Sequence, residues 1–139
     1  MKSVLIIDDD PEYLQIIGTI LLEAGYHVEQ ANCPDRAFKH LFESRFDLVI
    51  CDLHMPFKTG PEIFDFKYDY EVGVRTIQEL REACPGTALI AVSATMPWDL
   101  PKVMREIPEI SALTKPFSEH QLLELVTLSM TAPNQQMLH

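Results

Sequence analysis

A chain of 139 residues with 47% hydrophobic and 23% charged residues predicts one globular domain with a substantial core. Its formal net charge of −10 repels a phosphate backbone, which argues against direct binding to nucleic acid. No apolar run approaches the ~20 residues that span a bilayer, so we expect no membrane insertion, and three cysteines without metal-type spacing favour a reduced, cytoplasmic setting.

The first expected elements are a buried strand, an acidic turn and a helix. Residues 4–7 (Val-Leu-Ile-Ile) form the short apolar run of a strand covered on both faces, and three aspartates follow it. Pro11 suits the first position of a helix with Asp10 as its N-cap, and Gly25 is expected to close that helix. The apolar residues of this helix recur at helical spacing: Tyr13, Leu14, Ile17, Ile20, Leu21 and Ala24.

A weaker strand and a second helix come next. Residues 27–31 are short and more polar, which favours an edge strand. Pro34 begins a helix whose predicted apolar face consists of Ala37, Phe38, Leu41 and Phe42. Residues 46–51 are mostly apolar and lead straight into Asp52. This run predicts the central strand, buried on both faces and ending in a carboxylate.

The stretch after Asp52 breaks this pattern. From Phe64 to Val72, aromatic or apolar residues alternate with charged ones, which predicts an extended segment with one apolar face. A third helix is expected after Gly73. Residues 61–73 thus form an unusual segment between the third strand and the third helix. Its apolar side either covers its own domain or forms a surface for a partner or for self-association, and the sequence leaves both readings open.

Two more strands complete the predicted sheet. Residues 88–92 form an apolar run that ends at Ser93. Residues 110–114 form the last strand, and Lys115 follows it directly. Prolines between these strands confine a short fourth helix to residues 99–106.

A final helix and a polar tail end the chain. Ser118 with Gln121 three residues later is the pattern of a capping box. The helix that it begins carries the apolar residues Leu122, Leu123, Val126 and Met130. Residues 1–130 are thus expected to form one domain, and residues 131–139 a flexible C-terminal tail.

Strand and helix alternate five times along the chain, as (βα)5. Parallel strands joined by right-handed helical crossovers form a doubly wound α/β sheet. The carboxyl ends of parallel strands share one edge of such a sheet, where ligands bind. That edge is expected to collect Asp8, Asp9, Asp52, Ser93 and Lys115.

These residue types suit one kind of chemistry. Three carboxylates at one edge repel one another, and a hard divalent cation with oxygen ligands, Mg²⁺, relieves the repulsion. Lys115 adds an ammonium and Ser93 a hydroxyl donor, which are parts that phosphoryl transfer needs. The chain has no glycine-rich phosphate loop, so a bound nucleotide is not indicated. Asp52 itself is therefore the expected phosphoryl acceptor, which would give an aspartyl phosphate.

Four short blocks resemble the receiver domains of two-component response regulators, and they occur in that family's order. The blocks are Ile6-Ile7-Asp8-Asp9-Asp10, Asp52-Leu53-His54-Met55-Pro56, Ser93-Ala94 and Lys115-Pro116-Phe117. The resemblance covers residues 3–128, essentially the whole domain. It implies a flavodoxin-like, chemotaxis-regulator-like sheet with the strand order 2-1-3-4-5.

The resemblance also implies a role for each site residue. Asp52 is expected to accept a phosphoryl group from a histidine kinase or a phosphotransfer protein, while Ser93 hydrogen-bonds that group and Lys115 pairs with it. Asp9, Asp52 and the backbone carbonyl of His54 are expected to bind Mg²⁺, and Asp8 to act mainly through water. The Lys115–Pro116 peptide bond is expected to be cis.

Three features depart from the family pattern. The first is the insertion at 61–73. The second is Ala112, which stands three positions before the lysine, where receivers usually carry an aromatic switch residue. The third is the short fourth helix, around which receivers commonly signal. The switching mode, and self-association through 61–73 or the fourth-helix region, therefore stay open.

The leading hypothesis is a phosphorylation-controlled binding module rather than an enzyme. It would signal to a downstream protein target through protein contacts, without an output domain of its own. One alternative is a degenerate receiver that acts as a constitutive binding scaffold. Another is an aspartyl-phosphate phosphatase of the haloacid dehalogenase type. Those phosphatases expect an aspartate two residues after the nucleophile, where this chain has His54, and a cap domain, which it lacks.

Overall fold

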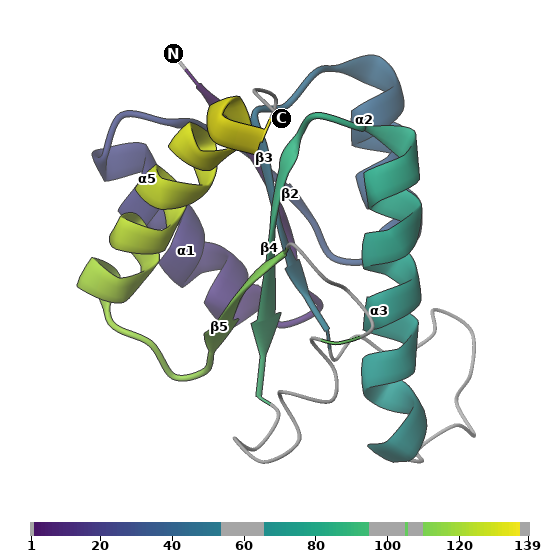
Figure 1. Ribbon diagram of the computed structural model, residues 1–139. Coiled ribbons are helices and arrows are strands. Elements are labelled where there is room, and N and C mark those ends of the chain that lie inside the picture. Colours follow the sequence, from purple (N-terminus) through teal and green to yellow (C-terminus); the bar gives the residue numbers. More distant parts are fainter. Residues whose placement is uncertain (1, 54–65, 95–104, 106–109, 137–139) are drawn as a thin grey trace.

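The computed structural model describes residues 2–53, 66–94, 105 and 110–136. These residues contain a five-stranded parallel sheet with the order β2-β1-β3-β4-β5 (Figure 1), so the predicted fold class and strand order are confirmed. The strands are β1 (Ser3–Ile7), β2 (His27–Ala31), β3 (Leu48–Asp52), β4 (Ala88–Ser93) and β5 (Ser111–Thr114). The more polar β2 lies at one edge of the sheet, as predicted.

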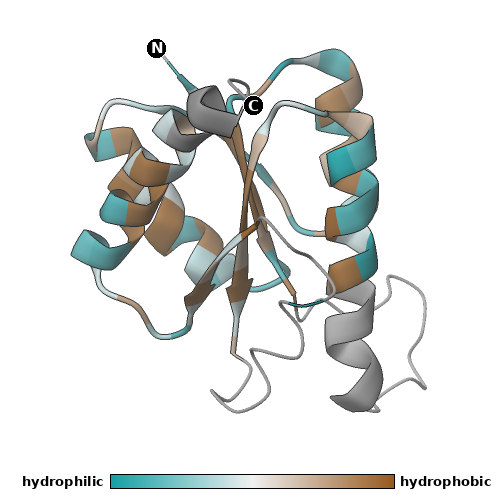
Figure 2. Cartoon of the chain, in the orientation of Figure 1, coloured by the Kyte–Doolittle hydropathy of each residue, from teal (hydrophilic) through white to brown (hydrophobic). Residues whose placement is uncertain are grey.

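Helices cover both faces of the sheet (Figure 1). On one face lie α1 (Pro11–Glu23) and α5 (Glu119–Gln136), and on the other lie α2 (Pro34–Glu43) and α3 (Phe66–Ala83). Figure 2 shows that the hydrophobic residues of the strands lie between these two helical layers. Within the part of the chain that the structure describes, no helix is both long and apolar enough to span a membrane.

The sheet separates two hydrophobic cores, which we call the α1/α5 core and the α2/α3 core. Successive side chains of a strand point to opposite faces, and β3 shows this directly. Leu48 and Ile50 belong to the α1/α5 core, whereas Val49 and Cys51 belong to the α2/α3 core. All five residues of β3 are buried, which confirms a strand covered on both faces.

Local capping sets the ends of two helices. The Asp10 side chain accepts a hydrogen bond from the Glu12 N–H at 2.9 Å and so caps α1. Gly25 follows this helix with a φ of 97°, a conformation that favours glycine. At α5, the Ser118 Oγ accepts from the Gln121 N–H at 3.0 Å and the Gln121 Oε1 accepts from the Ser118 N–H at 2.8 Å, so the predicted capping box is confirmed.

Helix α1 and strand β2 approach each other closely at Gly18. The Gln30 side-chain N–H donates to the Leu14 carbonyl at 3.0 Å. A Cβ added at Gly18 would lie 2.7 Å from the Gln30 Nε2. The missing side chain at position 18 therefore leaves room for the Gln30 amide against the helix.

The extended segment predicted from Phe64 to Val72 is wrong from residue 66 onward, because α3 begins at Phe66. Residues 64–65, like the first part of the proposed insertion 61–73, lie outside the described residues. The segment continues into a helix that is anchored by the buried Val74, Ile77 and Leu80. Extending an anchored helix costs less than nucleating a separate element, and one internal glycine costs only ~1 kcal/mol.

Phe42 was expected on the buried face of α2, but it is 93% exposed. Ala37 is fully buried, while Phe38 and Leu41 are partly buried against the α2/α3 core. Phe42 stands five positions after Ala37, which rotates it by about 140° around the helix axis. It therefore falls beyond the margin of the apolar stripe.

The end of the chain also differs from its prediction. Helix α5 continues to Gln136, through most of the segment 131–139 that was expected to be a flexible tail. The Thr131 hydroxyl lies within hydrogen-bonding distance of the Thr127 and Leu128 carbonyls, which ties residue 131 to the preceding turn. The helix predicted at 99–106 lies outside the described residues apart from Arg105, which is helical.

Candidate functional site

Three carboxylates meet at the carboxyl edge of the sheet. Asp8 follows β1 directly, and Asp52 ends β3, the strand that pairs with β1. Asp8 is 1% exposed and Asp52 is 3% exposed, whereas Asp9 is exposed. One oxygen of each carboxylate lies within 4.8 Å of the others. The predicted convergence of these three residues is therefore confirmed, and the cluster is open to solvent on the Asp9 side.

Asp8 and Asp10, which both follow β1, make different hydrogen bonds. The Asp8 N–H donates to the Ala31 carbonyl at 3.1 Å, which extends the β1–β2 pairing by one residue. Its Oδ1 accepts from the Asp10 N–H at 2.9 Å, while its Oδ2 accepts from the Lys115 ammonium at 3.0 Å. The Asp10 carboxylate caps α1 and does not belong to the acidic cluster.

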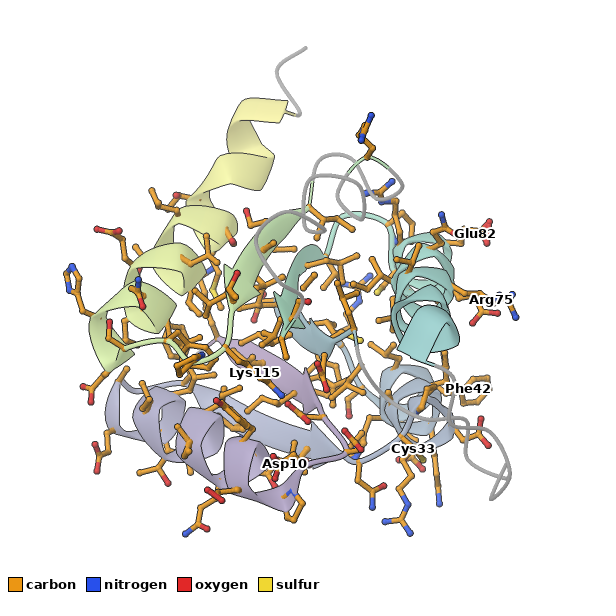
Figure 3. All side chains as sticks on the ribbon, turned by 90° about the horizontal axis from the view of Figure 1, so that it is seen from below. Asp10, Cys33, Phe42, Arg75, Glu82 and Lys115 are labelled. Carbon is orange, nitrogen blue, oxygen red and sulfur yellow. The ribbon has the colours of Figure 1, made fainter. Side chains whose placement is uncertain are left out.

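Lys115 brings a positive charge to the cluster from the last strand. Its backbone N–H donates to the Ser93 carbonyl at 2.8 Å, and its peptide bond to Pro116 is cis, as expected. The Nζ lies 3.0 Å from the Asp8 Oδ2 and 3.7 Å from the Asp52 Oδ2. In Figure 3, Lys115 lies close to the purple ribbon of β1 and α1, on the same side as Asp10.

Desolvation and neighbouring charges shift the pKa values of two groups of the site, Asp9 and Lys115. Asp9 is exposed as a residue, but partial desolvation of its carboxyl raises its pKa, and the neighbouring Asp8 raises it further. Burial alone would lower the pKa of Lys115, but the charge of Asp52 and the hydrogen bond and charge of Asp8 outweigh it, so that pKa is raised. Lys115 therefore stays an ammonium at neutral pH, and one positive charge faces three carboxyl groups.

Ser93 ends β4 next to the acidic cluster and is fully buried. It pairs in register with Thr114, the residue before Lys115, and its strand neighbour Val92 pairs with Asp52. The sheet thus brings Ser93 to the same edge as the other predicted residues. His54, whose carbonyl was expected to bind metal, lies outside the described residues, so that expectation is not tested.

Sequence reasoning missed the aromatic support of Lys115. Tyr13, on the first turn of α1, places its ring centroid 4.0 Å from the Lys115 Nζ. Phe117 packs against Tyr13 with their ring centroids 5.8 Å apart and the planes at 47°. The sequence showed Tyr13 only as one member of an apolar helical stripe, and nothing local to it pointed toward a residue near the other end of the chain.

The donor atoms of the cluster fit Mg²⁺. All three side chains offer carboxylate oxygens, which are the hard ligands that Mg²⁺ prefers over thiolates or imidazoles. The nearby Cys51 adds no soft ligand, because burial, with the charges of Asp52 and Asp8, raises the pKa of its thiol well above the usual value. Asp8, Asp9 and Asp52 are the residues that would hold the ion.

Comparison with known proteins decides the family. The model of the response regulator receiver domain matches residues 4–127, nearly the whole chain. The chain belongs to this family. The receiver domain is a part of two-component signalling systems, and the match decides against the haloacid dehalogenase-type alternative.

Curated relatives share this domain within longer proteins. A response regulator receiver protein from Anaeromyxobacter is 26% identical over 125 residues, covering 90% of this chain and 47% of the relative. The two-component response regulator ORR23 of rice is 45% identical over 64 residues, covering 45% of this chain and 9% of the relative. The chain therefore spans less than half the length of both relatives.

Solved structures support the fold. A CheY-like receiver domain from Methanospirillum hungatei superposes with a TM-score of 0.78 at 20% identity, with 98% of each chain covered. The response regulator TrrA of Thermotoga maritima, solved in complex with Mg²⁺-BeF, gives a TM-score of 0.71 at 24% identity, covering 91% of this chain and 97% of TrrA. At these identities the likeness shows a common CheY-like, flavodoxin-like fold.

Proposed function

We propose that the chain is a phosphorylatable receiver in which Asp52 accepts a phosphoryl group from a histidine kinase or a phosphotransfer protein, with Mg²⁺ at the acidic site. The placement of Asp52 carries this proposal. Its carboxylate is 3% exposed at the end of the central strand, its Oδ2 lies 3.7 Å from the Lys115 ammonium, and it clusters with Asp8 and Asp9. The TrrA complex with Mg²⁺-BeF supports the same reading by analogy.

The proposed reaction is simple for the protein to perform. An Asp52 carboxylate oxygen attacks the phosphorus atom of the donor, and the bond from phosphorus to the leaving group breaks. The leaving group takes the electron pair, so an ionised Asp52 needs no general base. Bound Mg²⁺ would neutralise charge on the phosphoryl oxygens. The Lys115 ammonium adds a second positive charge beside Asp52, and the Ser93 hydroxyl would donate to a phosphoryl oxygen.

In this proposal the protein changes its own state and does not turn over a substrate. Because Asp9 is exposed beside two buried carboxylates, the donor reaches the cluster from the Asp9 side. The phosphorylated domain then signals through contacts with a downstream protein target. The net charge of −10 still argues against nucleic acid as a direct partner.

The test is the intact mass of the protein after incubation with acetyl phosphate, with Mg²⁺ or with EDTA. We expect one added phosphoryl group on the wild type in Mg²⁺ and none in EDTA. Asp52→Asn removes the acceptor and should abolish the adduct. Asp47→Asn is the matched control, because Asp47 lies before β3 at the opposite edge of the sheet and its Oδ2 accepts from the Ser3 N–H at 2.8 Å, which an amide oxygen can still do.

Two results would contradict the proposal. An unmodified wild type in Mg²⁺ would overturn the phosphoacceptor role and favour the constitutive binding scaffold. An adduct that persists on Asp52→Asn would assign the phosphoryl group to another residue.

A further inference from the structure

Among the described residues, three side chains lie close to the ammonium of Lys115, and one of them carries no charge. Asp8 and Asp52 approach it with carboxylate oxygens at 3.0 and 3.7 Å, and the ring of Tyr13 faces it with a centroid at 4.0 Å. The Lys115 side chain is only 12% exposed. The ring of Tyr13 thus contacts the Lys115 ammonium together with the two carboxylates.

A ring face attracts an ammonium in a way that suits this position. The quadrupole of a phenol ring is negative on its face, and the attraction grows when the cation is withdrawn from water, as Lys115 is. Another carboxylate in place of the ring would add to the repulsion among the three carboxylates of the cluster and would compete for a divalent cation. The ring attracts the ammonium without either effect.

The ring is itself held in place by the α1/α5 core. Tyr13 lies on the first turn of α1, the end of the helix that Asp10 caps. Phe117, which lies two residues after Lys115 in the chain, packs against this ring, and the two ring centroids are 5.8 Å apart. Both aromatic residues are partly buried against the same core. The contact with Phe117 and the packing against the core thus restrict the conformations of the Tyr13 side chain.

We propose that Tyr13 is a positioning residue for Lys115: its ring face keeps the ammonium at the acidic edge, beside Asp52, where an incoming phosphoryl group needs it. The effect on phosphorylation rests on the proposed function, whereas the placement of the ammonium does not. Without the ring, the long lysine side chain gains conformations that point its charge into solvent, and the fraction of molecules with Nζ beside Asp52 falls.

The first test reads the placement directly, without any reaction. Protons on the lysine ε-carbon beside a ring face are shifted upfield in an NMR spectrum. The signal is assigned by its loss in Lys115→Met. We expect an upfield-shifted Lys115 signal in the wild type and in Tyr13→Phe, which keeps the ring. In Tyr13→Leu the signal should move to the position of an exposed lysine.

Tyr26→Leu is the matched control, because Tyr26 is also partly buried against the α1/α5 core and contributes no described contact to Lys115. It should leave the Lys115 signal unchanged. An unshifted Lys115 signal in the wild type would overturn the proposal, and this outcome does not depend on whether any variant folds. A signal that stays shifted in Tyr13→Leu would overturn it as well.

The second test measures the initial rate of phosphorylation by acetyl phosphate in Mg²⁺. Because Tyr13→Leu removes the cation–π contact, we expect its phosphorylation rate to fall roughly three- to tenfold. The rates of Tyr13→Phe and Tyr26→Leu should stay within about twofold of the wild-type rate. If Tyr13→Phe were as slow as Tyr13→Leu, the hydroxyl and not the ring face would matter, and the proposal would be wrong. If the wild type is never labelled, the proposed function fails, but the NMR test still decides the role of Tyr13.

Discussion

The α1/α5 core and the α2/α3 core differ in how they reach the acidic site. The α1/α5 core includes the rings of Tyr13, Tyr26 and Phe117, and through Tyr13 it contacts the charged end of Lys115. The α2/α3 core also contains aromatic rings, those of Phe38 and Phe46, but none of its residues makes a described contact with Lys115. Two helical layers that cover the same strands can therefore differ in whether they contact the charged side chains at the carboxyl ends of those strands.

This difference bears on how a change at the site would spread. Ala112, three positions before Lys115, carries no ring, so an aromatic switch at that position is absent. The described ring next to Lys115 belongs instead to α1. Because Tyr13 contacts Lys115 and packs in the α1/α5 core, we expect a displacement of the ammonium to affect α1 and α5 before α2 and α3. The following predictions test the two faces of the sheet separately.

The largest effect is expected from Lys115→Met. This substitution leaves the buried Asp8 and Asp52 side by side without their positive partner, so the free energy of unfolding in EDTA at pH 7 should fall by about 2–4 kcal/mol. Urea unfolding measures it. Lys39→Met, at an exposed lysine of α2, should change stability by less than about 0.5 kcal/mol.

The pH dependence of this variant follows from the raised pKa of Lys115. The contribution of the lysine is complete below its usual pKa of 10.5 and is lost as the pH rises through the higher value in the folded protein. The difference between wild type and Lys115→Met should therefore stay constant from pH 7 to 9 and shrink above 10.5. A difference that already shrinks between pH 7 and 9 would contradict the raised pKa.

The α2/α3 face is probed by one substitution at two neighbouring turns of α2. Phe38→Ala removes a ring that packs on the α2/α3 core and should cost about 2 kcal/mol, while Phe42→Ala removes an exposed ring and should cost less than about 0.5 kcal/mol. Chemical denaturation of both variants measures the two values. Equal losses would mean that the ring of Phe42 is covered in solution.

A smaller effect is expected at the contact between α1 and β2. Gly18→Ala gains about 1 kcal/mol of helix propensity but displaces the Gln30 amide from the Leu14 carbonyl, which costs about the same, so the net change should be near zero. In a Gln30→Ala background the hydrogen bond to the Leu14 carbonyl is already absent, so Gly18→Ala displaces nothing. There Gly18→Ala should stabilise the protein by about 1 kcal/mol, and a double-mutant cycle in urea measures the difference. Additive effects would show that the amide and the helix do not compete for the space.

The smallest effect is expected from Asp9→Asn. The raised pKa of Asp9 means that its ionised form costs stability, so removing the charge should stabilise the metal-free protein at pH 7, by less than about 1 kcal/mol because the side chain is exposed. The gain should vanish as the pH falls from the raised value to the usual 3.8, where the wild-type carboxyl takes up its proton. Thermal unfolding at pH 7 and pH 3 compares the two. A gain that persists at pH 3 would show that the charge is not its cause.

Features that depend on neighbours in the sequence could be predicted. The acidic strand ends, the Asp10 cap and the Ser118–Gln121 capping box each involve residues a few positions apart, and the structure has all of them. The meeting of Asp8, Asp52 and Lys115 could also be predicted, because a parallel sheet aligns all its carboxyl ends once the strands are identified.

What could not be predicted depends on packing. The alternation from residue 66 to 72 has the period of a strand, but its continuity with an anchored helix overrides that signal. Phe42 fails as a core residue by its angle around α2, which depends on how the helix is oriented on the sheet. The contact of Tyr13 with Lys115 joins the two ends of the chain and leaves no local pattern in either.

The strand order also sets when the site can be assembled during synthesis. β1 pairs with β2 and β3, so the first three strands can form a sheet before the rest of the chain leaves the ribosome. This part already contains Asp8 and Asp52, whereas Lys115 arrives only with β5. A nascent chain therefore has no ammonium of Lys115 beside Asp8 and Asp52 until β5 pairs with β4. We expect fragments that stop before Lys115 to leave these carboxylates accessible to solvent. The one positive charge of the described acidic site is thus added late in synthesis, with only α5 still to follow among the described helices and strands.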